Sequence, residues 1–254
     1  NQFNFKSFYL KKYMNNISFI FPVYNEEKRL SNIFSFLKWT KKNKIKNYEI
    51  LIISNGSNDN TIKILNSYSK KNRLIKYFHI SEASRGAAII TGIKKSNFEL
   101  NAICAIDNAW DLEFYPQAFK ILKTTNFNVV FGPKTHIYSK INRPIVRKII
   151  STICTLYLKL LFGDKIDQDT QCIKFFDKRK IKIIKYLSKR NLFFDAEFFL
   201  LIRMLKVKYL SIPVKVKDNK KMISVKMMLK FLYDALTFRF SKNFKKVISI
   251  NKKR

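Results

Sequence analysis

Residues 102–116 read AICAIDNAWDLEFYP, and this stretch decides the fold. The apolar run 102–106 has the length of a buried strand, and acidic residues begin where it stops, at Asp107. Asp111 and Glu113 follow, in a chain with 17 acidic residues against 51 lysines and arginines. Open α/β sheets bind ligands beyond the carboxyl ends of their strands. The stretch therefore predicts a strand that ends at a ligand site, with a plain strand end and a capped helix as the alternative.

Apolar runs alternate with helical patterns on both sides of this stretch. The expected strands are 17–23, 48–53, 74–80, 102–106 and 127–131. The polar segments between them contain residues that cap helices, and helical spacing follows each segment. This alternation predicts an α/β fold with a mostly parallel, doubly wound sheet flanked by helices. A length of 254 residues with 47% apolar residues fits one large domain.

The second half of the chain is more basic, and its helical segments are more apolar. A basic lead-in precedes IISTICTLYLKLLF at 149–162, and residues 222–240 interleave Met, Leu and Phe with Lys and Arg. We interpret 144–162 and 222–240 as basic amphipathic helices, lying on a membrane surface or buried in the core. The domain is expected to span 17–240, between a lead-in at 1–16 and a frayed basic tail at 241–254.

The formal net charge of +34 predicts an anionic partner, with generic surface charge as the alternative. The basic residues are spread along the chain and no zinc-finger, RNP or helix-turn-helix pattern occurs, so we expect no nucleic acid partner. No apolar run reaches the roughly 18 residues of a spanning helix. The three dispersed cysteines indicate a reducing compartment. We expect peripheral association with the cytoplasmic face of a membrane.

Six segments, in this order, resemble the family 2 inverting glycosyltransferases of the GT-A fold, and especially the dolichyl- or polyprenyl-phosphate sugar transferases. They are FPVYNEE (21–27), IISNGSNDNT (52–61), SRGAAIITGI (84–93), AIDNAWDLEFYP (105–116), DTQCIKFF (169–176) and FFDAE (193–197). The resemblance implies a nucleotide-sugar donor, a lipid-phosphate acceptor and a divalent metal, Mg²⁺ or Mn²⁺. It also places the basic amphipathic helices on the acceptor side.

The same resemblance implies roles for individual residues. The donor would be bound by six of them: Pro22, Tyr24, Glu26, Asn55, Arg85 and Gly86. The phosphate of the acceptor would be bound by three cations: Lys134, Arg143 and Arg147. The catalytic acids would be Asp107 and Asp169, and the metal ligands Asp107 and Asp111.

Two acidic motifs depart from the family pattern. Residues 54–57 read Ser-Asn-Gly-Ser in place of Asp-Asp-Gly-Ser, and residues 107–109 read Asp-Asn-Ala in place of Asp-x-Asp. The chain is therefore expected to be an enzyme with altered metal dependence, or else a non-catalytic homologue that binds a nucleotide sugar. A third alternative is transfer to a glycan hydroxyl, which would need Asp169 or Asp195 as a general base.

Overall fold

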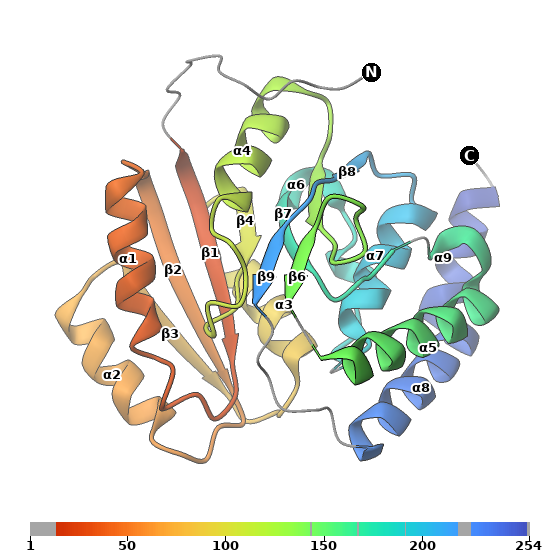
Figure 1. The fold of residues 1–254 in the computed structure, drawn as a ribbon, viewed down its shortest axis with the longest axis horizontal. Coiled ribbons are helices and arrows are strands. Elements are labelled where there is room, and N and C mark those ends of the chain that lie inside the picture. Colours follow the sequence, from red (N-terminus) through yellow and green to blue (C-terminus); the bar gives the residue numbers. More distant parts are fainter. Residues whose placement is uncertain (1–13, 143, 167, 191, 218–224, 253–254) are drawn as a thin grey trace.

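The computed structural model describes residues 14–142, 144–166, 168–190, 192–217 and 225–252. Its centre is a seven-stranded sheet in the order β3-β2-β1-β4-β7-β5-β8 (Figure 1). The strands are β1 (Asn15–Val23), β2 (Lys46–Asn55), β3 (Ile75–Ile80), β4 (Leu100–Ile103), β5 (Val129–Gly132), β7 (Ile173–Asp177) and β8 (Tyr209–Ser211). Neighbouring strands are parallel, except that β7 is antiparallel to both β4 and β5. The predicted mostly parallel α/β sheet is confirmed.

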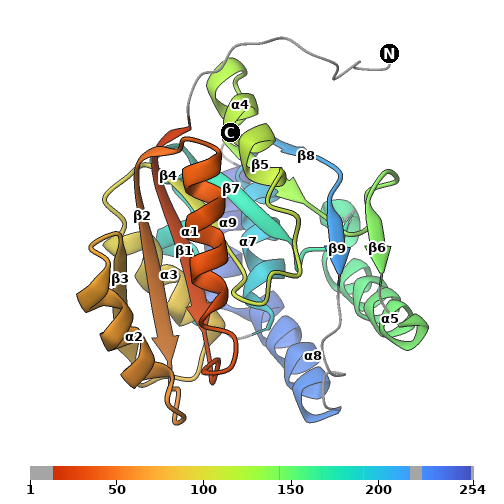
Figure 2. The same cartoon turned by 60° about the vertical axis from the view of Figure 1, so that its left-hand side comes forward.

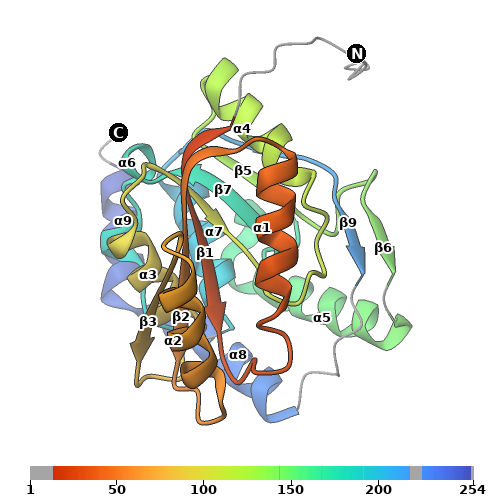
Figure 3. The same ribbon diagram turned by 90° about the vertical axis from the view of Figure 1, so that its left-hand side faces the viewer.

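Helices cover both faces of the sheet (Figure 3). One face carries α1 (Asn32–Lys42), α2 (Thr61–Lys71) and α4 (Phe114–Thr124), and the other carries α3 (Arg85–Lys95) and α7 (Phe194–Met204). Successive side chains of a strand point to opposite faces. In β1, Phe19 and Phe21 accordingly belong to the core under α1, and Ile20 to the core under α3. The two buried clusters therefore lie on opposite faces of the sheet, one under each layer of helices.

Further elements extend the fold beside β5 and β8. A small parallel ribbon joins β6 (Lys140–Asn142) to β9 (Lys215–Lys217). The helices α5 (Ile145–Phe162) and α8 (Val225–Phe240) follow these strands and lie side by side (Figure 2). Short helical turns occur at Gly163–Lys165, at α6 (Lys178–Ile181) and at Ile184–Tyr186. Both predicted amphipathic segments are therefore helical where the structure describes them.

The prediction of a frayed tail after residue 241 is wrong. Residues Lys242–Lys252 form α9, whose Phe244 and Val247 are buried in the core. The ring of Phe244 lies 5.5 Å from that of Phe162 and 5.4 Å from that of Phe238. The sequence did not indicate this helix, because Phe244 and Val247 are only two buried apolar residues in a segment rich in lysine. At the other end, residues 1–13 of the expected lead-in lie outside the described residues, and β1 already begins at Asn15.

Strand β4 is shorter than predicted, and Pro22 explains why. The β1–β4 ladder ends with the Cys104 N–H donating to the Ile20 carbonyl at 2.8 Å. The next donor on that edge of β1 would be the N–H of Pro22, which proline lacks. The strand therefore stops at Ile103, and Asp107 lies four residues beyond it, in a turn where Asn108 has a φ of +52°.

Candidate active site

The loops after β1 and β2 interlock at the carboxyl end of the sheet. The side chain of Asn25 exchanges hydrogen bonds with Asn58, at 2.8 and 2.9 Å, and the Glu26 N–H donates to Thr61 Oγ1 at 2.9 Å. Parallel neighbouring strands end at the same edge, so these loops meet although they are 33 residues apart. Tyr24 is exposed beside them, and Pro22 is half-buried.

Asn55 ends β2 and is only 5% exposed. Its amide oxygen is buried, and within the described part of the chain it accepts no hydrogen bond. Buried polar atoms are usually paired with a hydrogen-bond partner. The Asn55 oxygen at the carboxyl edge of the sheet therefore indicates a ligand that donates a hydrogen bond to it. Gly56 follows with a φ of +67°, and its N–H donates to the Ile80 carbonyl at 2.8 Å.

Arg85 and Gly86 begin α3 against the loop that precedes α7. The Ser84 hydroxyl caps the helix by accepting from the Ala87 N–H at 3.2 Å, and it donates to the Lys189 carbonyl. A Cβ on Gly86 would overlap the carbonyl oxygen of Arg190. Gly86 is therefore packed closely against the backbone at residues 189–190. Donor contacts by Arg85 and by Gly86 both stay predictions.

Asp107 is half-buried in the loop that follows β4, and this loop is anchored at both ends. Asn32 donates to the Ile106 carbonyl at 2.9 Å. Further along, the Asp111 N–H donates to Lys215 and the Lys217 N–H to Ala109, at 3.0 and 2.9 Å, so the loop pairs with β9. The acid is thus turned neither into the core nor fully into solvent.

The predicted metal ligands, Asp107 and Asp111, each accept a hydrogen bond from a nearby backbone N–H. Asp107 Oδ1 accepts the N–H of Ala109 at 3.2 Å, and Asp111 Oδ1 accepts that of Glu113 at 3.1 Å. Among the described residues, no three His, Cys, Asp or Glu side chains gather as a metal site. Magnesium is commonly held by one or two carboxylates together with substrate phosphates. The residues present fit only a metal shared in this way with a bound diphosphate.

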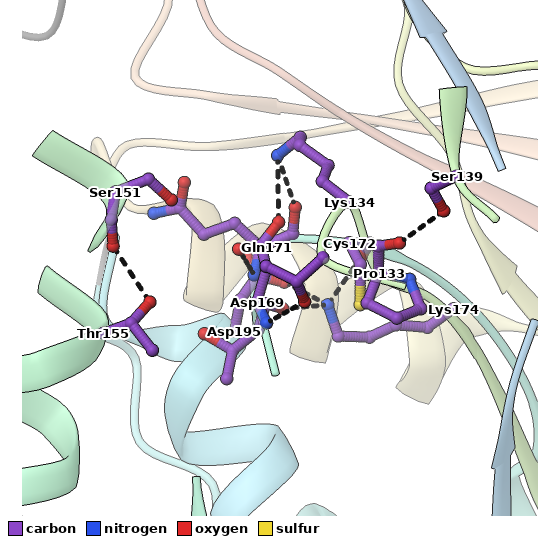
Figure 4. Close-up of polar contacts among 12 residues, drawn as sticks. Pro133, Lys134, Ser139, Ser151, Thr155, Asp169, Gln171, Cys172, Lys174 and Asp195 are labelled. Carbon is purple, nitrogen blue, oxygen red and sulfur yellow. Dashed lines mark hydrogen bonds and ion pairs between the residues drawn. The ribbon is translucent and has the colours of Figure 1, made fainter. Parts of the chain in front are cut away.

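A second part of the site lies around Asp169, in a pocket next to α5 and α8. Lys134 is 12% exposed, and its Nζ donates to Asp169 Oδ2 at 3.3 Å and to the Gln171 carbonyl at 3.0 Å (Figure 4). Arg147, from the first turn of α5, lines the same pocket. The structure thus brings Lys134, Arg147 and Asp169 together, while Arg143 lies outside the described residues.

The wall of this pocket formed by α5 and α8 is mainly apolar, with Ser151 and Thr155 of α5 as polar members. Its apolar lining comes from α5, α8 and one loop residue: Ile150, Cys154, Leu158, Leu192, Met228 and Phe231. The pocket therefore has a cationic end next to Asp169 and an apolar side along two helices. A ligand with an anionic head and a hydrocarbon tail matches this division.

Sequence reasoning missed Trp110 and Lys174. The Lys134 Nζ lies 5.0 Å from the centre of the Trp110 ring, a cation–π contact that joins the Asp107 loop to the pocket. Lys174 lies in β7 beneath the turn that carries Asp169 and is fully buried. A lysine within an apolar strand was a signal in the sequence, because buried lysines are rare unless they are paired.

Asp195 is wrongly placed to be a general base. It is buried, and its two oxygens accept from Lys174 Nζ at 2.6 Å and from Arg85 Nε at 3.1 Å. Burial alone acts to raise the pKa of Asp195, but the charges of Arg85 and Lys174 outweigh burial and hold that pKa below its ordinary value. Both oxygens of this buried carboxylate are held by cations, so Asp195 is poorly placed to reach the proton of an acceptor hydroxyl.

The outer sides of α5 and α8 expose large apolar side chains. On α5 these are Ile145, Val146, Ile149, Ile153, Leu156 and Leu160, and on α8 Val225, Met227, Leu229, Tyr233, Leu236 and Phe240. Leu160 is 83% exposed. Exposed lysines at 148, 159, 226 and 230 accompany them. None of the described helices combines the length and the hydropathy that crossing a bilayer requires.

This order of strands, with its polar loops at one sheet edge, is that of the GT-A glycosyltransferases. Glucosyl-3-phosphoglycerate synthase from Mycobacterium tuberculosis, solved with Mn²⁺, UDP and phosphoglyceric acid, superposes with a TM-score of 0.62. The superposition covers 88% of this chain and 78% of that one, at 13% sequence identity. The likeness shows the fold, and the predicted GT-A class is confirmed.

The chain belongs to glycosyl transferase family 2, whose model matches residues 18–203. It is 30% identical to the dolichyl-phosphate beta-glucosyltransferase ALG5A of Trichomonas vaginalis, over 87% of this chain and 72% of that protein. It is 28% identical to the dolichyl-phosphate beta-glucosyltransferase of Saccharomyces cerevisiae, over 89% of this chain and 74% of that one. The predicted resemblance to dolichyl-phosphate sugar transferases is confirmed.

Proposed function

We propose that this glycosyltransferase moves a sugar from a nucleotide sugar to a polyprenyl or dolichyl phosphate, with inversion, at the cytoplasmic surface of a membrane. The observation that carries the proposal is the pocket at Asp169, where Lys134 and Arg147 meet the apolar sides of α5 and α8. The relatives named for dolichyl-phosphate glucosyl transfer support the same acceptor class.

The acceptor chemistry follows from this pocket. A lipid phosphate is anionic at pH 7, so its oxygen can attack without surrendering a proton to a strong base. Lys134 and Arg147 would bind the phosphate by charge-assisted hydrogen bonds and orient it, and Asp169 would hold the Lys134 ammonium in place. A glycan hydroxyl would need a general base, whereas Asp169 is paired with Lys134 and Asp195 is buried.

The donor would bind across the loops after β1, β2 and β4. The buried amide oxygen of Asn55 would accept an N–H of the base, and Tyr24 and Glu26 would flank the nucleoside. Asp107 would face the diphosphate and share a divalent ion with it. Such an ion, when bound, offsets the charge that develops on the leaving diphosphate. Mn²⁺ and UDP in the mycobacterial synthase support this assignment for the donor.

A transfer assay tests the proposal. Purified protein, a short polyprenyl phosphate and Mn²⁺ are incubated with UDP- and GDP-sugars, and glycolipid is measured. We expect product with one donor, and Asp107→Asn lowers its rate about 100-fold, equivalent to about 2.7 kcal/mol of transition-state stabilisation. If no donor gives product yet calorimetry detects nucleotide-sugar binding, the non-catalytic alternative is correct. If a soluble glycan is the better acceptor, the lipid assignment is wrong.

Membrane attachment is tested separately by flotation with vesicles. The apolar sides of α5 and α8 would enter the lipid interface, and each nearby lysine adds about 1 kcal/mol at an anionic surface. We expect the protein to float with phosphatidylserine vesicles at low salt, and Ile153→Glu with Leu160→Glu to abolish flotation. Leu74→Glu, at an exposed apolar residue far from both helices, serves as the control. Equal flotation of both variants would contradict attachment through these helices.

A further inference from the structure

Lys174 satisfies all three of its ammonium hydrogens inside the protein. Its side chain is 1% exposed. Its Nζ donates to the carbonyl oxygens of Thr170 and Cys172, at 3.2 and 2.7 Å, and to Asp195 Oδ1 at 2.6 Å. Three donors and three acceptors leave no hydrogen-bonding capacity unused. The Lys174 ammonium is therefore held at three points inside the protein.

Two lysines hold the turn 169–172 from opposite sides (Figure 4). Lys134 binds the Gln171 carbonyl and the Asp169 carboxylate from the side of the pocket. Lys174 binds the alternate carbonyls, of Thr170 and Cys172, from the core. Within the turn, Asp169 Oδ1 accepts the Gln171 N–H at 3.0 Å. The backbone that presents Asp169 is thus clamped between a cation in the pocket and a cation in the core.

The same network reaches the donor side of the site. Asp195 binds Lys174 with one oxygen and Arg85 Nε with the other. Arg85 begins α3, whereas the Asp169 turn precedes β7, so the link joins segments about 85 residues apart. Replacing a buried ion pair with apolar side chains is often neutral or stabilising. The Lys174–Asp195 pair is therefore poorly explained by a gain in stability. It is better explained by the geometry that it imposes on the Asp169 turn and on Arg85.

We infer that Lys174 is a positioning residue that fixes the turn carrying Asp169 relative to Arg85, and so holds the acceptor and donor sides in one arrangement. The inference rests on the proposed function for the roles of Asp169 and Arg85. A catalytic group displaced by about 1 Å can lose about 100-fold in rate, so a residue that prevents such displacement matters without touching substrate.

Three variants separate positioning from folding. Lys174→Met leaves Asp195 buried beside a single cation and lowers Tm. Lys174→Met with Asp195→Leu removes both members of the buried pair, and Tm recovers part of this loss. The carbonyls of Thr170 and Cys172 still lack the Lys174 donor in this variant. The matched control is Lys178→Met, because Lys178 follows the other end of β7 and donates to the Ser96 carbonyl and hydroxyl, away from the site.

The readouts are amide hydrogen exchange at residues 169–172 and the rate of sugar transfer. We expect the double variant to exchange its Gln171 and Cys172 amides at least about tenfold faster than the unmodified protein, and to lose about 10- to 100-fold in kcat. Lys178→Met leaves both readouts unchanged. A double variant that keeps full protection and a kcat within about threefold overturns the inference, and so does one that never folds, since the network would then serve folding alone.

These outcomes are distinguishable from failure of the proposed function. If the unmodified protein transfers no sugar to any acceptor, the proposed function fails, and hydrogen exchange at the Asp169 turn still decides whether Lys174 fixes that turn. If transfer occurs and exchange at the turn is unchanged in the double variant, the proposed function stands and the positioning role is wrong.

Discussion

Replacing Lys134 with methionine will lower kcat/KM for a polyprenyl phosphate about 1,000-fold, equivalent to about 4 kcal/mol. Lys134 is nearly buried at the cationic end of the pocket, where its Nζ contacts Asp169, Gln171 and the face of Trp110. The variant loses the charge that would bind the phosphate and leaves the Asp169 carboxylate facing an anionic acceptor. Truncating one member of a buried charged pair costs 2–5 kcal/mol or more in comparable interfaces. Steady-state kinetics with varied acceptor measures the loss.

Lys140→Met is the matched control for this prediction, because Lys140 is an exposed lysine six residues further along the chain. It should change kcat/KM by less than about threefold. Binding of a nucleotide diphosphate, measured by calorimetry, should remain near normal in Lys134→Met, since that residue lies on the acceptor side. An equal loss in the two lysine variants would show that overall charge, rather than the pocket, governs acceptor use.

Gly86→Ala will destabilise the protein by about 3 kcal/mol and lower Tm by about 6–12 °C. Helix propensity alone predicts the opposite sign, because alanine is favoured over glycine inside a helix by about 1 kcal/mol. The added Cβ would overlap the backbone carbonyl of Arg190 and lie 2.8 Å from the ring of Phe194. Since a backbone cannot move aside as a side chain does, α3 must shift away from the loop that precedes α7. Thermal unfolding followed by circular dichroism measures the effect.

Gly92→Ala gives a graded comparison in the same helix. There the new Cβ would meet the γ2 methyl of Ile20, which belongs to a side chain and not to a backbone carbonyl. We expect a smaller fall in Tm than for Gly86→Ala. A higher Tm for Gly86→Ala than for the unmodified protein would contradict the close packing of α3 against the 189–190 backbone.

The sequence predicted the sheet well because the strands carry strong local signals. Apolar runs bounded by polar caps located β1, β2, β3 and β5, and the motif order located the loops at their carboxyl ends. The end of β4 was missed because it depends on Pro22 in a neighbouring strand. Helix α9 was missed because two buried apolar residues stand among exposed lysines. In both cases the deciding contact lies outside the local pattern.

By itself, the sequence determined the α/β class, the family and the residue types available for donor, acceptor and metal. It did so because hydrophobic periodicity and the order of motifs are local features of the sequence. Only the tertiary structure decided which of these residues meet. Lys134 binds Asp169 and lies over the ring of Trp110. Asp195 is buried and binds both Lys174 and Arg85. Those pairings join strands and loops far apart in sequence, and burial and charge are settled only once the chain has packed.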